Sequence, residues 1–320
     1  MAIGLGIIGL GVVGRRTMGQ ALADPKFRVA AGWDLSADAR AQALAEYPDL
    51  SVAGDAQGVF GDPEVDLVYI ATPPASHRDY ALAAFDAGKA IFCEKPLSVD
   101  LAQGREMVMR AAESKRPSAV NFVHASSVGG EKIRAAVAEG RLGELRGVDI
   151  RLHFARWPRE WQAAASNWLS SREQGGYTRE VLSHFLYLTE RIFGSVKLEG
   201  ASVAYPPETR LAETHVVARL SFGNLAVTVA ASSGGVGLDE IEFTVWGDRL
   251  SYRLTDWHVL WESDGGGWQA VASGVADVRA EGFRRQLGQL ADMMEGRGHT
   301  LADFAVAYAV QETVESILGS

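Results

Sequence analysis

The sequence is almost free of cysteine, since Cys93 is the single one among 320 residues. One cysteine cannot form an intrachain disulfide, and it cannot build a cysteine-based metal cluster. The composition therefore excludes a disulfide-stabilised secreted domain and is typical of a protein that works in the reducing cytoplasm.

Long hydrophobic runs are also missing. No stretch approaches the roughly 18 to 20 apolar residues that a membrane-spanning helix needs. The apolar run at the N-terminus has no basic segment before it and no small-residue cleavage site after it. This run predicts a core strand rather than a signal peptide, and we expect no membrane partner.

Positive charge is in deficit, because 31 Lys and Arg residues oppose 40 Asp and Glu residues, giving a formal net charge of −9 at pH 7. An acidic chain does not favour nucleic acid or an anionic membrane as its main partner. The apolar fraction of 47% and the charged fraction of 22% are ordinary for a soluble globular protein. The length predicts about two domains.

What the sequence does contain is a glycine pattern directly after its first apolar run. The run begins at Ile3 and ends in G-x-G-x-x-G, formed by Gly9, Gly11 and Gly14. Gly9 permits a tight turn, Gly11 lets the backbone approach a pyrophosphate, and Gly14 lets the following helix pack close to the strand. The pattern predicts a dinucleotide site between a strand and a helix.

The start of that helix and the next strand complete the predicted site. The amides of Val12 and Val13 present the positive end of the helix dipole to phosphates. Asp34 ends the second predicted strand, where a carboxylate can bond both adenosine ribose hydroxyls and repel a 2′-phosphate. We therefore expect NAD, with NADP left open because Arg40 follows within two helix turns. The alternative is that Asp34 only caps a helix.

Strand and helix patterns alternate over residues 1–120 and stop alternating after Asn121. Alternation predicts an α/β Rossmann domain with a doubly wound parallel sheet. Residues 121–320 predict an α+β domain with a large, mostly antiparallel, open-faced sheet, whose last helix can return to the first domain. The main elements expected there are helices at 130–139, 178–192, 281–295 and 301–317, a strand at 145–154, and a meander of strands over 196–271.

Two loops follow buried strands at the carboxyl edge of the predicted parallel sheet, where ligands of open α/β sheets bind. The first contains Thr72, Pro73 and His77, which we expect to contact the cofactor; the alternatives are a stiff turn and a surface histidine. The second contains Glu94, which we also expect to contact the cofactor, and Lys95. An oxidised nicotinamide disfavours the ammonium form of a nearby lysine, so Lys95 is suited to hold or relay a substrate proton.

The second loop leaves two points open. A Glu/Lys pair at a strand end is often only a solvated ion pair. The bond between Lys95 and Pro96 is a candidate cis peptide, although only about 5–6% of bonds before proline are cis.

A third candidate site lies on a predicted helix of the second domain. Glu180 and His184 are spaced i, i+4, so their side chains can meet on one helix face. A carboxylate on one ring nitrogen fixes the tautomer and raises the basicity of the other. The alternatives are a purely structural pair and a metal site, for which no third ligand has supporting spacing. We expect no metal.

Together these motifs resemble the Gfo/Idh/MocA oxidoreductases over nearly the whole length. The resemblance rests on the glycine fingerprint, the loop with His77 and the run Glu94-Lys95-Pro96, and then on the segments 140–144, 175–176 and 283–287. It implies that Lys95 is the catalytic lysine and His184 the catalytic histidine. Three positions depart from the family pattern, because Pro74, Glu180 and Tyr187 stand where Asn, Asp and Asp are common.

The resemblance implies NAD(P)-dependent transfer of a hydride between nicotinamide and a ring hydroxyl or carbonyl of a sugar, cyclitol or related polyol. In this interpretation Glu180 orients His184 as the base, Lys95 stabilises the alkoxide, and the site is a cleft between the domains. The alternatives are a redox-assisted glycoside hydrolase that uses NAD and a non-catalytic dinucleotide-binding regulator.

Substrate contacts are expected from Lys95 and His184 and from four further residues, His124, Trp168, Tyr177 and Tyr187. Trp157 and Trp161 form either a sugar-stacking wall or plain packing. The strands at 214–222 and 225–231 carry more apolar residues than one buried face needs. We therefore expect a homodimer or homotetramer joined through that sheet.

Overall fold

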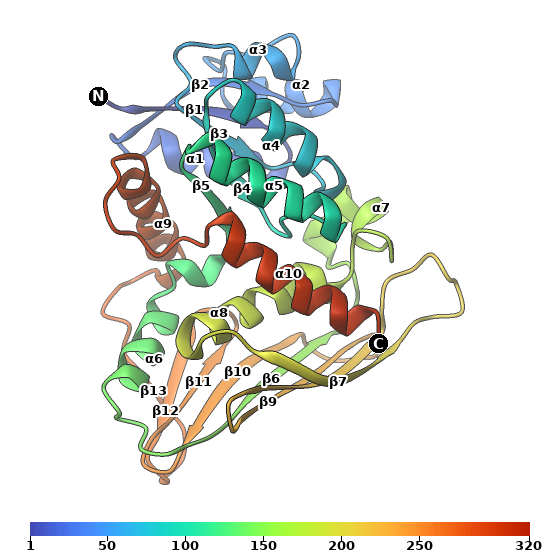
Figure 1. The fold of residues 1–320 in the computed structure, drawn as a ribbon, viewed down its shortest axis with the longest axis vertical. Coiled ribbons are helices and arrows are strands. Elements are labelled where there is room, and N and C mark those ends of the chain that lie inside the picture. The colour runs from blue at the N-terminus through green and yellow to red at the C-terminus, as the bar shows by residue number, and fades with distance from the viewer. The chain divides into compact units, whose positions relative to one another are not determined.

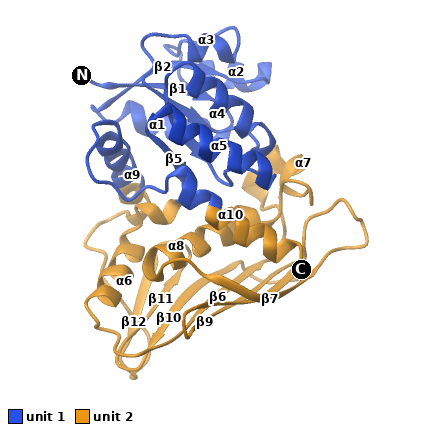
Figure 2. Ribbon diagram, viewed as in Figure 1, with its two compact units in different colours: residues 1–122, 283–308 blue, residues 123–282, 309–320 orange.

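The computed structural model describes residues 1–320, which form two compact units (Figure 2). Unit 1 comprises Met1–Phe122 and Phe283–Tyr308, and unit 2 comprises Val123–Gly282 and Ala309–Ser320. None of the helices is both long and apolar enough to cross a membrane.

Unit 1 is built on a five-stranded parallel sheet with the strand order β2-β1-β3-β4-β5. Its strands are β1 (Ile3–Ile8), β2 (Phe27–Trp33), β3 (Leu67–Ile70), β4 (Ala90–Glu94) and β5 (Ser118–Asn121). All four residues of β3 are buried, as expected for a strand covered on both faces. The predicted doubly wound α/β sheet is confirmed.

Helices connect these strands (Figure 1): α1 (Val12–Leu22), α2 (Ala37–Glu46), α3 (Ala56–Phe60), α4 (His77–Asp86) and α5 (Leu101–Ser114). Two of them begin at side chains that cap free amides, since Ser36 accepts a hydrogen bond from the Ala39 N–H and Asp100 accepts one from the Gln103 N–H. The short helix α3 was not predicted, because five residues carry too little periodicity to identify a helix.

Unit 1 also contains a segment from the end of the chain. Most of helix α9 (Val278–Met294) and the first residues of α10 (Phe304–Leu318) belong to it. The domain boundary predicted from the sequence had placed all of residues 121–320 in the second domain. Val120 N–H donates to Ala302 O at 2.8 Å, and the rings of Phe85 and Phe304 pack edge to face. These contacts attach the late segment to the edge of the parallel sheet.

Unit 2 is built on an eight-stranded sheet with the order β13-β12-β11-β10-β6-β9-β8-β7. Only β6 and β9 pair in parallel, so the prediction of a mostly antiparallel sheet is confirmed. The strands are β6 (Leu145–Phe154), β7 (Lys197–Ala204), β8 (His215–Phe222), β9 (Leu225–Ser233), β10 (Glu240–Gly247), β11 (Ser251–Thr255), β12 (Val259–Ser263) and β13 (Gln269–Ala270).

Helices α6 (Val128–Ala138) and α8 (Ser183–Phe193) belong to unit 2, together with the short α7 (Ser166–Leu169). Phe185 of α8 stacks on Phe243 of β10 at 6.1 Å between ring centroids, which fixes this helix on one face of the sheet. A π-helical turn, Thr178–Leu182, precedes α8 and was expected to be regular helix.

The prediction of surplus apolar residues on strands β8 and β9 is tested by which of their side chains are buried. Buried and exposed residues alternate along β8, so that Val216, Ala218 and Leu220 lie inside while His215 and Arg219 face solvent. Val217 is the one large apolar side chain among the exposed positions of this strand before Phe222. The apolar residues thus mainly serve the inner face, and assembly into a dimer or tetramer stays a prediction.

Candidate functional site

The glycine turn of unit 1 has the shape that a phosphate-binding turn needs. Gly9 adopts φ +102°, and a Cβ added there would lie 2.5 Å from the carbonyl oxygen of Ala71. A Cβ on Gly14 would lie 1.9 Å from the Gly9 carbonyl oxygen, whereas one on Gly11 would meet no atom within 4 Å. The turn therefore requires glycine at two positions for its own geometry, and at Gly11 it is open.

Helix α1 starts at this opening without a side-chain cap, because its N-cap residue is Gly11. The amides of Val12 and Val13, in its first turn, therefore have no capping side chain. Uncapped amides at a helix N-terminus form a ready anion site. The residues present fit the pyrophosphate of a dinucleotide, in agreement with the spacing of the glycines.

Asp34 is held at the end of β2 by two backbone amides. Its carboxylate accepts hydrogen bonds from the N–H groups of Leu10, at 2.7 Å, and Ser36, at 2.8 Å. Arg40 folds back on the same loop and donates to the carbonyl oxygens of Asp34 and Leu35. The loop thus offers a carboxylate suited to ribose hydroxyls and, beside it, a guanidinium suited to a 2′-phosphate.

His77 is completely buried at the start of α4. Its two ring nitrogens lie 2.9 Å from the carbonyl oxygens of Thr72 and Pro96. Burial lowers the pKa of His77, with a smaller contribution from the charge of Lys95, although the two carbonyl acceptors favour the charged form. His77 therefore ties the Thr72 loop to the loop after β4, and its contact with the cofactor stays a prediction.

The carboxylate of Glu94 ends β4 inside a chain of hydrogen bonds. It accepts from the hydroxyl of Tyr69 and, at 2.6 Å, from the side-chain amide of Asn121, whose oxygen accepts from Gln286 at 2.6 Å. Burial, together with the neighbouring charge of Glu94, raises the pKa of Tyr69 well above its usual range, so that the phenol remains a donor.

Lys95 is the residue directly after Glu94, which belongs to this network. It is 8% exposed, and its peptide bond to Pro96 is cis. The network holds the end of β4 rigidly, so the backbone from which the lysine side chain extends has a fixed position.

In unit 2, His184 lies in the first turn of α8 and is 7% exposed. Its Nδ1 accepts a hydrogen bond from the backbone N–H of Val123 at 3.3 Å. A nitrogen that accepts carries no proton, so the neutral ring has its proton on Nε2. The predicted bond between Glu180 and His184 stays a prediction, and the backbone amide supplies a means of fixing the tautomer that the sequence did not indicate.

Two aromatic rings surround His184. Trp257 lies 5.3 Å from it between ring centroids, and His124 lies 6.4 Å from it, both edge to face. His124 is completely buried, and neither of its ring nitrogens has a hydrogen-bond partner. Burial, aided by the charges of His258 and Arg191, lowers the pKa of His124 to about 3, so the ring is neutral at physiological pH.

Trp257 is a site residue that sequence reasoning missed. Asp256 and Trp257 have φ values of +48° and +69° and are the two central residues of the turn between β11 and β12, which is closed by a hydrogen bond from the His258 N–H to Thr255 O. Such turns normally carry Asn-Gly or Asp-Gly, since a bulky side chain at positive φ is strained. The sequence Asp-Trp therefore gave no usual turn signal, although the strained turn sets the indole against His184.

Three other predicted substrate residues have different surroundings. Tyr177 is completely buried, donates its hydroxyl to the carbonyl oxygen of Ala231 at 3.3 Å, and packs against Phe154. This burial does not favour a direct substrate contact. Tyr187 is 3% exposed, and Trp168 on α7 is half-buried. Their contacts with substrate stay predictions.

Glu180 lies in the π-helical turn before α8, and Gln162 donates to its carboxylate at 3.3 Å. Gln162 also accepts two hydrogen bonds from Arg159. Neither Gln162 nor Arg159 was predicted from the sequence, because nothing in the spacing of residues 159–162 points toward Glu180. Interrupted helices of this kind are frequent at functional sites.

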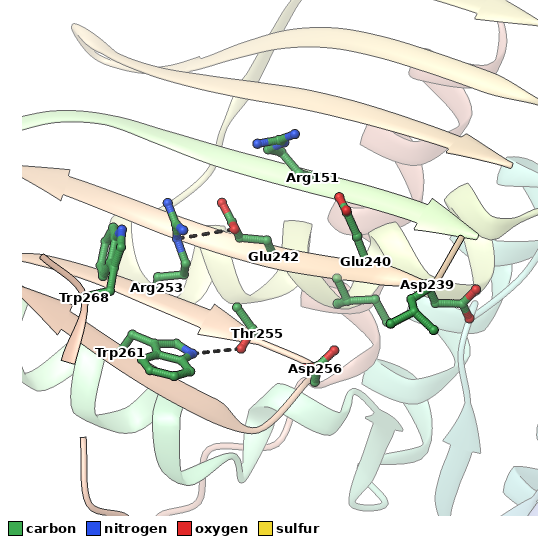
Figure 3. A pocket seen from close by; sticks show the side chains of 11 residues that line it. Arg151, Asp239, Glu240, Glu242, Arg253, Thr255, Asp256, Trp261 and Trp268 are labelled. Atoms are coloured by element: carbon green, nitrogen blue, oxygen red, sulfur yellow. Dashed lines mark hydrogen bonds and ion pairs between the residues drawn. The ribbon is translucent and has the colours of Figure 1, made fainter. Parts of the chain in front are cut away.

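A separate cavity of about 490 Å³ lies on the sheet of unit 2 (Figure 3). Arg253, one of its lining residues, forms an ion pair with Glu242 at 3.3 Å and lies over the ring of Trp268. None of the residues predicted for catalysis, cofactor or substrate lines this cavity. No group of three or more His, Cys, Asp or Glu side chains is arranged to hold a metal ion.

Two family models match the chain. The first is described as an oxidoreductase family with an NAD-binding Rossmann fold and matches residues 3–122; the second is described as the C-terminal alpha/beta domain of the oxidoreductase family and matches residues 134–318. These matches agree with the parallel sheet of unit 1 and with most of unit 2.

Comparison with individual proteins gives relatives of differing specificity. Inositol 2-dehydrogenase of Pseudomonas fluorescens (strain SBW25) is 33% identical over 160 residues, which is 48% of this chain and 46% of that protein. For the first three curated relatives, the matched region spans between 25% and 46% of their length.

Two solved structures share the fold over nearly all of both chains. Levoglucosan dehydrogenase in complex with NADH and levoglucosan has a TM-score of 0.86 at 19% identity and covers 100% of this chain and 97% of that one. Biliverdin reductase from Synechocystis sp. PCC 6803, in complex with biliverdin and NADP+, has a TM-score of 0.81 at 21% identity with 99% of both chains covered. Identities this low show the fold and leave the substrate open.

Proposed function

The chain belongs to the Gfo/Idh/MocA family of oxidoreductases, and on this premise we propose that it transfers a hydride between a nicotinamide cofactor and a ring hydroxyl or carbonyl group of a sugar, cyclitol or related polyol. The observation that carries the proposal is a pair of shielded side chains able to handle protons, one in each unit. Lys95 of unit 1 is 8% exposed and His184 of unit 2 is 7% exposed.

The two side chains have different tasks in the proposed reaction. When bound, the nicotinamide cofactor accepts the hydride in oxidation and returns it in reduction. Because Nδ1 of His184 accepts the Val123 N–H, we assign to its Nε2–H a hydrogen bond to the substrate oxygen, which orients that oxygen and stabilises negative charge on it. Lys95 takes the hydroxyl proton in oxidation and returns it in reduction.

This assignment exchanges the tasks given to the two residues by the sequence interpretation, in which His184 was the base. The reason is the hydrogen bond from Val123, since a ring held with Nδ1 as acceptor already carries a proton on Nε2. Taking up a second proton would place an N–H on Nδ1 opposite the N–H of Val123. The backbone amide therefore opposes the imidazolium form that a base must adopt.

The first experiment is an absorbance screen with NAD and NADP over sugars, cyclitols, sugar acids and glycosides. Lys95→Ala and His184→Asn are each expected to lower turnover by about 10²- to 10⁴-fold while NADH still binds. Added methylamine should restore part of the activity of Lys95→Ala and none of that of His184→Asn, because only the former lacks a proton carrier. Lys26→Ala and His215→Ala change exposed residues and serve as controls.

The same screen contains the outcomes that would contradict the proposal. Near-normal turnover in either active-site variant would remove the role assigned to that residue. Release of nitrophenol from a glycoside without accumulation of NADH would indicate redox-assisted hydrolysis. Intact dinucleotide binding with no turnover of any compound would indicate a regulator.

A further inference from the structure

Arg159 lies in a cage of aromatic rings beside the segment that carries Glu180. Its guanidinium carbon is 5.0 Å from the ring centroid of Trp161, 5.7 Å from that of Trp157 and 5.6 Å from that of Phe154. The side chain is half-buried, and burial lowers the pKa of Arg159, while the charges of Glu180 and Asp239 oppose this effect. The cage therefore holds a cation partly removed from water.

The other shielded arginines of unit 2 all have carboxylate partners. Arg134, Arg179, Arg191 and Arg253 are buried or half-buried, and each forms an ion pair with a glutamate. Arg159 is the exception, because no carboxylate lies within ion-pair distance of it. A desolvated charge is costly without a partner. The lack of a carboxylate partner at Arg159 therefore needs an explanation, which the other four arginines do not.

The hydrogen bonds of Arg159 leave its outer edge available. The side-chain oxygen of Gln162 accepts from Nε of Arg159 at 3.1 Å and from its backbone N–H at 3.2 Å. Neither Nη1 nor Nη2 donates to a protein acceptor. Gln162 is 4% exposed and fixes the guanidinium from one side, so the two terminal nitrogens form a preorganised pair of donors.

The position of Arg159 connects it with the proposed active site. Gln162 uses its other end to donate to Glu180 at 3.3 Å, and Glu180 precedes His184 by four residues on the same helical segment. Two hydrogen bonds thus join Arg159 to Glu180, and all of these residues belong to unit 2. A group bound at Arg159 would therefore be joined by hydrogen bonds to the helical segment that carries His184.

We propose that Arg159 binds a carboxylate of the substrate through Nη1 and Nη2, so that the substrates of this enzyme are sugar acids or other polyhydroxylated acids. The proposal rests on the proposed function and names its substrate class. A planar guanidinium matches a carboxylate in shape through two parallel hydrogen bonds. One positive charge also balances one carboxylate, whereas a phosphate dianion would bring excess negative charge near Glu180 and Asp239.

The experiment compares acids with their neutral counterparts, using D-glucuronate with D-glucose, D-galacturonate with D-galactose, and D-gluconate with D-sorbitol. We expect kcat/KM to be at least tenfold higher for the acid in one or more pairs. In Arg159→Met, which keeps the apolar contacts with the rings, kcat/KM for that acid should fall by about 10- to 100-fold. Most of the loss should appear in KM, and kcat/KM for the neutral compound should change less than threefold.

Two further variants separate charge from shape and from general damage. Arg159→Lys keeps the positive charge without the two-pronged geometry and should recover only part of the preference for acids. Arg156→Met removes an exposed arginine of the same segment and should leave the preference unchanged. Binding of the same acids and neutral compounds is also measured by the shift in thermal midpoint, which does not require turnover.

The outcomes distinguish this inference from the proposed function. Loss of acid binding in Arg159→Met, in a protein that forms no NADH with any compound, supports the carboxylate site and rejects the dehydrogenase. Turnover that favours the neutral compound in all three pairs, or an equal fall for acid and neutral compounds in Arg159→Met, rejects the carboxylate site and leaves the dehydrogenase standing.

Discussion

The two units differ in how completely they pair their buried polar groups. In unit 1, Glu94 receives hydrogen bonds from Tyr69 and Asn121, and both nitrogens of His77 face carbonyl oxygens. The buried side-chain nitrogens and oxygens without a hydrogen-bond partner all lie in unit 2. They belong to His124, which has two, and to Ser126 and Thr178.

The difference follows the proposed tasks of the units. A dinucleotide is recognised largely by backbone amides and one carboxylate, so unit 1 can be fully paired before the ligand arrives. Recognition of a particular small molecule needs side chains with spare donors and acceptors. A buried polar group without a partner costs about 1–3 kcal/mol, and such groups persist mainly where function requires them.

The largest test of this comparison concerns His124. Its pKa is lowered to about 3 from an ordinary value of 6.5, so the unfolded chain takes up a proton between these pH values and the folded chain does not. Stability is therefore complete above pH 6.5 and is lost as the pH falls, by about 3–5 kcal/mol in total. His124→Phe should remove this part of the acid sensitivity and should not lower stability at pH 7.5.

Urea unfolding at pH 7.5 and pH 4 measures both effects, with His215→Phe, a change at an exposed histidine, as the control. Equal acid sensitivity in the wild type and in His124→Phe would mean that this ring titrates normally in the folded protein. The contrast between the units would then rest on Ser126 and Thr178.

A smaller effect is expected when the complete network of unit 1 is broken. Tyr69→Phe removes one donor from the Glu94 carboxylate and should lower the free energy of unfolding by about 1.5–3 kcal/mol, as for a hydrogen bond to a charged group. Tyr80→Phe, in the same unit, changes a half-buried ring whose hydroxyl makes no hydrogen bond, and it is the matched control. Replacement by phenylalanine would thus destabilise the protein at Tyr69 of unit 1 but not at His124 of unit 2.

Measuring Tyr69→Phe beside Tyr80→Phe is the most direct way to sharpen the comparison. If Tyr69→Phe cost no more than Tyr80→Phe, the hydrogen bonds around Glu94 would contribute nothing to stability. Unit 1 could then not be described as held by its polar network.

The smallest effect concerns the choice of cofactor. Asp34→Ser removes the carboxylate that repels a 2′-phosphate and leaves Arg40 beside the same loop. We expect the ratio of the Kd for NADPH to the Kd for NADH to fall by about tenfold, equivalent to ~1.4 kcal/mol. Titration of the two reduced cofactors by fluorescence measures the ratio, and an unchanged ratio would mean that Asp34 does not select NAD.

The sequence predicted those features that depend on neighbours in the chain. The spacing of Gly9 and Gly14 identified a turn in which a Cβ on either residue would meet backbone, and the strand predicted at 145–154 is β6 to the residue. These features are local, because strand burial and turn geometry follow from a few consecutive residues.

The remaining features depend on contacts between distant segments. Trp257 reaches His184 through a strained turn whose residues carry no turn signal. Arg159 is distinctive only because no carboxylate lies within ion-pair distance of it. The absence of a partner cannot be read from a one-dimensional sequence that contains 40 acidic residues. Similarly, the amphipathic pattern of α9 indicates a helix without indicating the unit on which it packs.

The late segment that joins unit 1 has a consequence for how this protein is made. Strand β5 lies at the edge of the parallel sheet, and the bonds that cover it come from Gln286, which is 165 residues away in sequence, and from Ala302. While the ribosome is still synthesising unit 2, that edge is uncovered and open to pairing with other chains. Any nascent chain that stops before this segment therefore leaves unit 1 unfinished, however completely its first 122 residues have folded.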